Sequence, residues 1–168
     1  MNNEGIWVYH QPGKLWLKIN GRGSFQNAHF LKDLLADATE HNEKITLTNI
    51  NLTDCTGLDS TFLGAIAGLA LQVKKNGGST TVTGASGRNR ELLENMGLSL
   101  LLDIRPDNIE ASPVPLVKVE KPIADKEFAA ATMLEAHETL AQLSESNYSQ
   151  FQNVIDYLRR RAVKQSTP

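Results

Sequence analysis

The sequence predicts an α/β protein, with a mixed β-sheet, helices packed on that sheet and a helical hairpin at the C-terminus. Three observations favour this class. Short runs of branched and aromatic residues alternate with segments of helical periodicity. Glycine and proline turn signals separate these segments. Of the 168 residues, 40% are hydrophobic and 21% are charged, which is enough apolar material for a core.

The chain starts with a predicted β-hairpin. Ile6 to His10 and Leu15 to Ile19 are short runs with aromatic and branched residues, and Gln11-Pro12-Gly13 lies between them. Pro-Gly at that place is a turn signal. We therefore expect the two runs to pair as adjacent strands.

Helices and strands then alternate, which gives the predicted order β-β-α-β-α-β-α-β. After Gly21 to Gly23, a helix capped by Asn27 is expected from apolar residues at helical spacing, namely Phe30, Leu31, Leu34, Leu35 and Ala38. Ile45 to Leu52 is predicted as a strand, and Thr53 to Leu58 as a loop. Consecutive βαβ crossovers imply parallel strands with helices packed against them.

The second helix is predicted from about Ser60 to Asn76, and Gly77-Gly78 ends it. It is apolar nearly all round, and it contains the small residues Gly64, Ala65, Ala67 and Gly68. Small residues let a helix approach a sheet or another helix closely, so we interpret this segment as a buried core helix. The remaining predicted elements are the strand Thr80 to Thr83, the helix Arg90 to Met96 and the strand Leu98 to Ile104.

Prolines indicate where the chain divides. Four of the six prolines lie in the stretch 106–125, namely Pro106, Pro113, Pro115 and Pro122. X-Pro steps disfavour helix and remove backbone donors. The sequence therefore predicts a sheet domain over residues 1–105, a linker over 106–125 and a helical hairpin over 126–164. The alternating run Leu116 to Lys121 predicts a short edge strand inside the linker.

Each helix of the predicted hairpin has an apolar stripe, and Ser144 to Asn147 supplies the turn. The stripes are Ala130, Met133, Leu134, His137 and Leu140 on the first helix, and Phe151, Val154, Ile155, Leu158 and Ala162 on the second. Two helices bury little apolar surface by themselves, so the pair should dock on the sheet domain or on another chain. Three roles stay open: covering the sheet edge, forming a homodimer and adding a partner surface.

Charge and cysteine content exclude several functional classes. The chain has 17 Lys+Arg against 19 Asp+Glu, a net charge of −2, which argues against a nucleic-acid binder. Its single cysteine, Cys55, cannot form an internal disulfide, which fits a reducing compartment. We see no signal-peptide pattern and no apolar run long enough for membrane insertion, so we expect a soluble, cytoplasmic protein.

We expect no metal, no cofactor and no catalytic residue. The four histidines lack ligand spacing, and none of them lies within six residues of Cys55. A nucleophilic cysteine needs a base and a lowered pKa, so a small buried side chain is the preferred interpretation of Cys55.

A family resemblance rests on two features, a polar residue at the end of a strand and a polar segment at the start of a helix. Asn51 stands at the end of a predicted strand, eight residues before Asp59 in the segment Asp59-Ser60-Thr61-Phe62-Leu63-Gly64. This pattern resembles the signature of the STAS domain, the family that joins sulfate transporters and anti-sigma-factor antagonists. Gly77-Gly78 and Met96-Gly97-Leu98 also agree, and the resemblance covers roughly residues 5–105.

The resemblance implies a binding module rather than an enzyme. In the partner switching of this family, the unphosphorylated domain binds an anti-sigma factor with serine kinase activity. Phosphorylation of the serine after the motif's Asp dissolves the complex, and a phosphatase resets it. That serine is Ser60 here, so the resemblance implies a phosphoprotein that acts in signal transduction and transcription regulation.

The physical chemistry of Ser60 agrees with such a role. Ser60 lies at a loop-to-helix junction, where either Asp59 or Ser60 itself can cap exposed backbone N–H groups. A phosphate at Ser60 would meet the positive end of the helix, so it should not melt the domain. The alternative is that Asp59-Ser60 is only a helix cap.

Two departures from the family pattern affect the expected partner surface. Phe62 replaces the signature's glycine, and either points into the core or contributes to a different partner surface. Ser24, in Gly21-Arg22-Gly23-Ser24, stands where many antagonists have an Asp near the acceptor serine. We expect partner binding at Asp59, Thr61, Phe62, Ser24 and Asn51.

A second function remains open at this stage. The chain could be a STAS subunit that docks on a transporter or another regulatory complex without phosphorylation. The two hypotheses differ in the behaviour of Ser60→Asp, which releases the partner under the first and leaves it bound under the second.

Overall fold

The strands form one mixed sheet, in which β4 (Cys55–Leu58) pairs with β2 beside the main path. The order along that path is β6 (Leu102–Arg105), β5 (Ser79–Thr83), β3 (Leu47–Asn51), β2 (Lys14–Gly23), β1 (Gly5–Gln11) and β7 (Val117–Lys118). The computed structural model describes residues 3–85, 87–106, 114–120 and 125–165. The strands β1 (Gly5–Gln11) and β2 (Lys14–Gly23) pair antiparallel, which confirms the predicted hairpin.

Parallel pairing continues the sheet on the other side of β2. The strands β3 (Leu47–Asn51), β5 (Ser79–Thr83) and β6 (Leu102–Arg105) follow in that order, each parallel to its neighbour. These are the strands that the βαβ pattern predicts. The mixed α/β fold is therefore as expected from the sequence.

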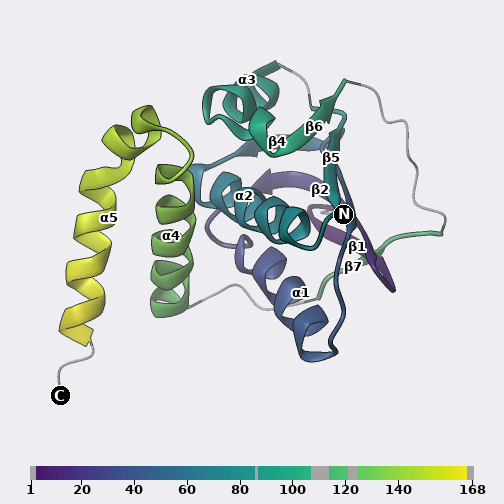
Figure 1. Ribbon diagram of the computed structural model, residues 1–168, viewed down its shortest axis with the longest axis horizontal. Helices are drawn as coiled ribbons and strands as arrows, with labels where there is room; N and C mark the ends of the chain where they lie inside the picture. Colours follow the sequence, from purple (N-terminus) through teal and green to yellow (C-terminus); the bar gives the residue numbers. More distant parts are fainter. Residues whose placement is uncertain (1–2, 86, 107–113, 121–124, 166–168) are drawn as a thin grey trace.

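Helices cover one face of this sheet (Figure 1). The helices α1 (His29–Glu40) and α2 (Ser60–Lys75) lie side by side in front of it. The helix α3 (Gly87–Asn95) and the 3₁₀ turn η1 (Leu98–Leu100) lead into β6. The last strand is thus shorter than predicted, because the chain makes one more helical turn first.

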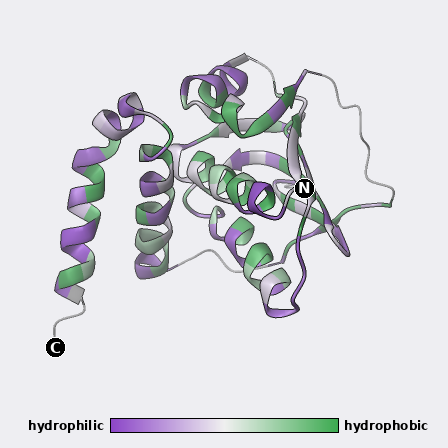
Figure 2. Ribbon diagram, in the orientation of Figure 1, coloured by the Kyte–Doolittle hydropathy of each residue, from purple (hydrophilic) through white to green (hydrophobic). Residues whose placement is uncertain are grey.

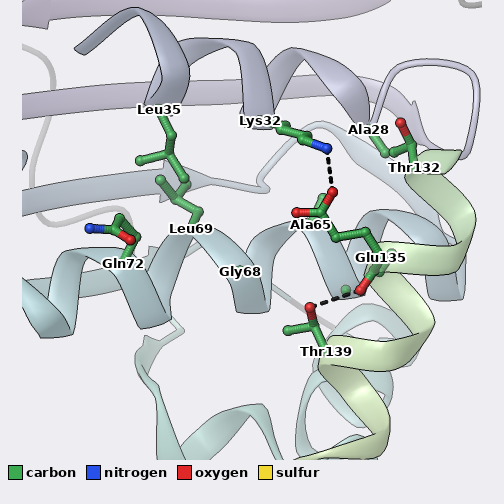
Figure 3. Close-up of a pocket in the computed structure, with 12 residues that line it drawn as sticks. Ala28, Lys32, Leu35, Ala65, Gly68, Leu69, Gln72, Thr132, Glu135 and Thr139 are labelled. Atoms are coloured by element: carbon green, nitrogen blue, oxygen red, sulfur yellow. Dashed lines mark hydrogen bonds and ion pairs between the residues drawn. The ribbon is translucent and has the colours of Figure 1, made fainter. Parts of the chain in front are cut away.

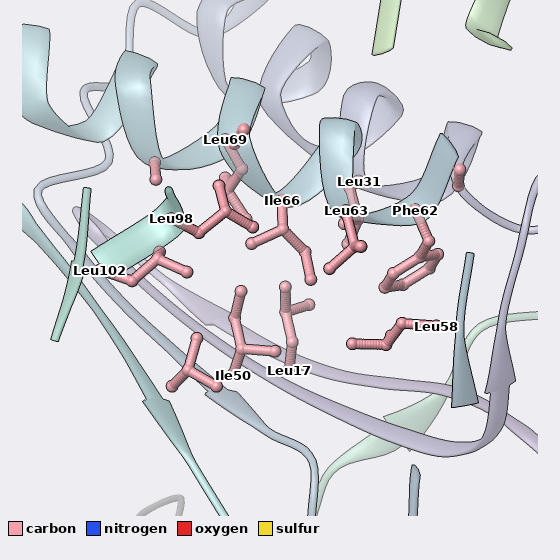
Figure 4. Close-up of a cluster of buried hydrophobic side chains, with 14 of the residues drawn as sticks. Leu17, Leu31, Ile50, Leu58, Phe62, Leu63, Ile66, Leu69, Leu98 and Leu102 are labelled. Carbon is pink, nitrogen blue, oxygen red and sulfur yellow. The ribbon is translucent and has the colours of Figure 1, made fainter. Parts of the chain in front are cut away.

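The core lies between α2 and the sheet (Figure 4). Leu17 and Ile50 point up from β2 and β3, and Phe62 and Ile66 point down from α2; all four are at most 1% exposed. Burial of large side chains stabilises a fold by roughly 1.5–3 kcal/mol each. The start of α2 is therefore fixed from below by its own side chains.

Two local features differ from the prediction, and both concern the end of β2. The predicted loop contains a strand, β4 (Cys55–Leu58), that pairs in parallel with Gly21–Gly23 at the end of β2. Asn27 does not cap α1: its Oδ1 accepts from the Ser24 N–H at 2.9 Å, and α1 begins after Ala28 without a side-chain cap. A tertiary strand pairing and a tight loop thus replace the simple turn.

The expected edge strand is present in the proline-rich stretch. It is β7 (Val117–Lys118), which pairs antiparallel with β1. Part of the predicted linker thus belongs to the sheet. Residues 107–113 and 121–124, also predicted as linker, lie outside the described residues.

The C-terminal hairpin consists of α4 (Lys126–Ala141) and α5 (Glu145–Gln165). Figure 1 shows α4 between α2 and α5, so the hairpin packs on the helical layer and not on the sheet edge. Leu140, Phe151 and Ile155 belong to the same buried cluster as the core under α2. The hairpin therefore extends the core of the sheet domain.

The faces that the hairpin buries agree only in part with the predicted stripes, because His137 and Leu140 on α4 are buried as predicted whereas Ala130, Met133 and Leu134 are only partly buried. On α4, the residues that become buried are mostly small, namely Ala129, Thr132, Ala136, His137 and Leu140. On α5, Phe151, Ile155 and Leu158 are buried, whereas Val154 and Ala162 are exposed. Figure 2 shows the resulting alternation of hydrophilic and hydrophobic residues along α5.

Asn147 anchors the turn of the hairpin to the sheet domain. Its side chain is 1% exposed, and its Nδ2 donates to the carbonyl oxygens of Met96 at 3.0 Å and Leu140 at 2.9 Å. A single amide thus satisfies two buried carbonyls, one after α3 and one at the end of α4. Along the described parts of the chain, no helix combines the length and apolar character needed to cross a bilayer.

We expect Asn147→Ala to lower the free energy of unfolding by about 2 kcal/mol, because two buried carbonyls lose their donor. Asn153→Ala is the matched control, since Asn153 is exposed on the same helix, and it should change stability by less than about 0.5 kcal/mol. Urea titration measures both. Equal effects of the two substitutions would contradict the anchoring role of Asn147.

Candidate functional site

The position of Ser60 is set by the strand that precedes it. β4 pairs with the last residues of β2, and the Asp59 N–H then donates to the Gly23 carbonyl at 3.0 Å. The chain turns into α2 directly after this bond, so Ser60 is the first residue of the helix. Ser60 is partly exposed.

Asp59 is the cap of α2. Its Oδ1 accepts from the Phe62 N–H at 2.9 Å, and its Oδ2 accepts from the Phe25 N–H at 2.8 Å. One carboxylate therefore satisfies a free donor of the first helical turn and ties the loop after β2 to the same point. Of the two caps that the sequence allows, the structure has Asp59.

The Ser60 hydroxyl is hydrogen-bonded to His137 of α4. Ser60 Oγ lies 2.9 Å from His137 Nε2, and His137 Nδ1 lies 2.6 Å from the carbonyl oxygen of Met133. A carbonyl only accepts, so Nδ1 carries a hydrogen; in the neutral ring Nε2 is then an acceptor, and the Ser60 hydroxyl donates to it. His137 is 6% exposed, and its ring packs edge-on against Phe151 of α5 at 5.1 Å.

At Gly64, one turn further along α2, the backbone of α4 lies very close. A Cβ on Gly64 would lie 2.6 Å from the carbonyl carbon of Ala136 and closer still to its oxygen. Real Cβ atoms do not approach backbone atoms so closely, so only glycine permits this packing. Because Ala136 precedes His137, this contact also places the imidazole at Ser60.

A groove of about 180 Å³ runs beside this contact, between α1, α2 and α4 (Figure 3). Lys32 of α1 reaches across it to form an ion pair with Glu135 of α4. Gly68 lies on its floor with nothing within 4 Å of the position of a Cβ. The groove marks where α4 no longer fills the surface of α2.

A match to a family model identifies the family. A family model described as the STAS domain matches residues 6–111, which is more than half of the chain. The chain belongs to the STAS domain family.

Three solved structures are similar to this STAS domain, and the first two, each with a TM-score of 0.50, agree with its fold. A putative anti-sigma factor antagonist (TM1081) from Thermotoga maritima is 21% identical with a TM-score of 0.50, covering 61% of this chain and 86% of that one. The Bacillus cell fate determinant SpoIIAA, in its phosphorylated form, is 14% identical with a TM-score of 0.50, covering 60% and 90%. A sulfate transporter family protein from Wolinella succinogenes is 22% identical with a TM-score of 0.49, covering 60% and 82%. No curated protein matches the sequence.

Phe62, the largest departure from the STAS signature, is a core residue. It is 0% exposed, and its ring fills the space that a Cβ of Gly23 would need, 2.7 Å from Phe62 Cδ1. Of the two alternatives for Phe62, the structure has the buried one, so its side chain is not part of the surface. Thr61, at 4% exposed, is buried as well.

Ser24 and Asn51 hold their own loops. Ser24 is 7% exposed, and its Oγ accepts from the Gln26 N–H at 3.3 Å. Asn51 Oδ1 accepts from the Thr53 N–H at 2.9 Å, which turns the chain at the end of β3. Ser24 therefore lies near Asp59, because the next residue, Phe25, donates its backbone N–H to the Asp59 carboxylate. The Asn51 side chain bonds only within its own turn.

Cys55 has the environment of an inert thiol. Its Sγ donates to the Gly57 carbonyl at 3.4 Å, and burial raises its pKa above the ordinary value for cysteine. A raised pKa keeps the thiol protonated near neutral pH, and the thiol is a poor nucleophile. Within the described residues, no group of three His, Cys, Asp or Glu side chains could hold a metal ion.

Sequence reasoning missed two members of this site. His137 is separated from Ser60 by 77 positions, and only its place on the apolar stripe of α4 indicated burial. The backbone N–H of Phe25 carries no side-chain signal at all. Both enter the site through tertiary packing.

We expect Asp59→Ala to cost more stability than Asp125→Ala, its matched control. Asp125 caps α4 through one bond, to the Phe128 N–H at 2.8 Å, and it is exposed. Loss of one cap bond costs about 1 kcal/mol, so Asp125→Ala should cost about that, and Asp59→Ala about 2 kcal/mol. Chemical denaturation measures both, and equal losses would contradict the double role of Asp59.

Proposed function

We propose that this protein is a regulatory binding module whose partner surface surrounds the start of α2 and is switched by phosphorylation of Ser60. Its partners would be an anti-sigma factor with serine kinase activity and a phosphatase, and it would act in cytoplasmic signalling to transcription. The proposal assigns no catalytic residue and no cofactor to the chain.

The observation that supports this proposal is that Asp59 and Ser60 have different hydrogen-bond partners. Asp59 makes both side-chain bonds that hold the helix start. The Ser60 hydroxyl makes neither of them, and bonds to His137 instead. A modification of Ser60 would therefore leave the cap of α2 intact, which argues against a purely structural role for this serine.

Electrostatics also support a phosphate at this position. The first turn of a helix exposes backbone N–H groups and the positive end of the helix dipole, both of which favour a negative group. A phosphate adds roughly 1.5 to 2 negative charges near pH 7. The net charge of the chain is only −2, so this would be a large local change.

The partner surface that we propose is smaller than the set predicted from sequence. Thr61 and Phe62 are buried, and Ser24 is nearly so. Ser60 and Asp59 are partly exposed, and Phe25, which Asp59 fixes, is 40% exposed. Because Phe62 and Gly23 compensate each other inside the core, the loss of the signature glycine does not change this surface.

Incubation with a switch kinase and ATP should add the mass of one phosphate to the intact chain. Ser60→Ala should abolish the gain, whereas Ser79→Ala, at an exposed serine elsewhere on the domain, should keep it. Intact-mass spectrometry after long incubation measures all three. An equal gain in Ser60→Ala would exclude Ser60 as the acceptor.

Binding assays with Ser60→Asp and Ser60→Ala separate the proposal from its alternative. Under the proposal, Ser60→Asp loses the partner and Ser60→Ala keeps it. If both variants bind equally, the chain acts as a STAS subunit that docks without phosphorylation. The observation that favours this alternative is that the Ser60 hydroxyl is bonded to His137 of α4, which makes it less accessible to a kinase.

A further inference from the structure

The Ser60 surface is already occupied by a helix of the same chain. His137 of α4 accepts the Ser60 hydroxyl, and both Ala136 and His137 are buried against α2 or α5. Ser60 is partly exposed, but a protein that binds its hydroxyl must displace His137 and the part of α4 that contains it. The same holds for an enzyme that transfers a phosphoryl group to the hydroxyl.

The fit between α4 and α2 is close where Ser60 is covered and loose further along. At Gly64 the backbone of α4 lies so near that no Cβ fits. At Gly68, one turn later, nothing lies within 4 Å of the position of a Cβ. The close contact with α4 is thus on the first turns of α2, which contain the proposed phosphorylation site.

The outer contacts of α4 are of a kind that can open. The ion pair between Lys32 and Glu135 joins two side chains that are 50% and 57% exposed, and such pairs contribute little to stability. The turn of the hairpin, which follows His137 by about one helical turn, is held separately, because Asn147 donates to the carbonyls of Leu140 and Met96. A helix held at one end returns readily after release, because tethering gives it a high effective concentration.

We infer that the C-terminal hairpin is a built-in competitor for the Ser60 surface, and that partners and modifying enzymes reach Ser60 only when α4 leaves. This inference rests on the proposed function of Ser60 as the switch. The partner that fits this surface is an amphipathic helix. It needs a small residue opposite Gly64, because that residue takes the place of Ala136.

Phosphorylation would then act on the hairpin as well as on the partner. Only a shared hydrogen separates Ser60 Oγ from His137 Nε2 at 2.9 Å. A phosphorylated Oγ has no hydrogen to donate and a phosphoryl group does not fit in that space, so α4 loses its hydrogen bond to Ser60 while Ser60 is phosphorylated. Phosphorylation therefore weakens the competitor at the site where the partner binds.

A thiol placed at residue 60 tests this cover without any kinase. The probe is 5,5′-dithiobis(2-nitrobenzoate), used on the full chain with Ser60→Cys and Cys55→Ala. In this background, Gly64→Ala should raise the labelling rate at least about tenfold, because its methyl group overlaps the Ala136 carbonyl. Gly68→Ala is the matched control on the same helix, and should change the rate less than about twofold.

A charge exchange provides a second test at exposed positions, where folding is not at risk. Lys32→Glu places two carboxylates together and should raise the labelling rate about two- to threefold. Adding Glu135→Lys to this variant restores an ion pair and should return the rate to its starting value. Circular dichroism checks that every variant is folded.

Three results would overturn the inference. One is a labelling rate for the Ser60→Cys thiol, in the starting background, equal to that of free cysteine. Another is an equal response to Gly64→Ala and Gly68→Ala. Protection that grows with protein concentration would also contradict it, because the cover would then come from a second copy.

The outcome separates this inference from the proposed function. If labelling follows the expectation but a kinase never modifies Ser60, even in Gly64→Ala, the cover stands and the phosphorylation switch fails. If a kinase modifies the native chain and Gly64→Ala at the same rate, and labelling shows no difference, the switch stands and the cover fails.

Discussion

The backbone contact between α2 and α4 at Gly64 is the constraint on which the rest of the site depends. Without a side chain at residue 64, the carbonyl of Ala136 lies where a Cβ would otherwise be. This depth of packing brings the neighbouring His137 to the Ser60 hydroxyl. It also lets the small face of α4 close over a surface that the core under α2 holds rigid from below.

The start of α2 therefore has two supports of different kinds. The Asp59 carboxylate and the pairing of β4 with β2 hold the helix start permanently, through bonds within the STAS domain. The contact with α4 comes from a separate element, and its outer ion pair is exposed. A regulatory group at Ser60 can disturb the second support without touching the first, which is the arrangement a binding switch needs.

Sequence reasoning reached the elements that have local signals and missed those that depend on packing. The small residues of α2, the glycines after it and a cap at either Asp59 or Ser60 follow from periodicity and capping rules, and the structure decides for Asp59. β4 lacks alternation and exists because Gly21–Gly23 continue β2 beside it. The stripes of α4 and α5 were assigned by large apolar residues, whereas α4 buries mainly its small ones. His137 could be placed on a helix but not beside Ser60, because no local rule connects residues 77 positions apart.

Native-state hydrogen exchange of the full chain tests most directly whether α4 is a releasable cover. Amides release their protection in cooperative units whose opening energies differ. We expect the amides of α4 to exchange more slowly than in an unfolded chain but through an opening that leaves α2 protected. Exchange of α4 at unfolded rates would mean that it does not cover Ser60. Exchange of α4 and α2 only together, in global unfolding, would mean that the cover does not open by itself.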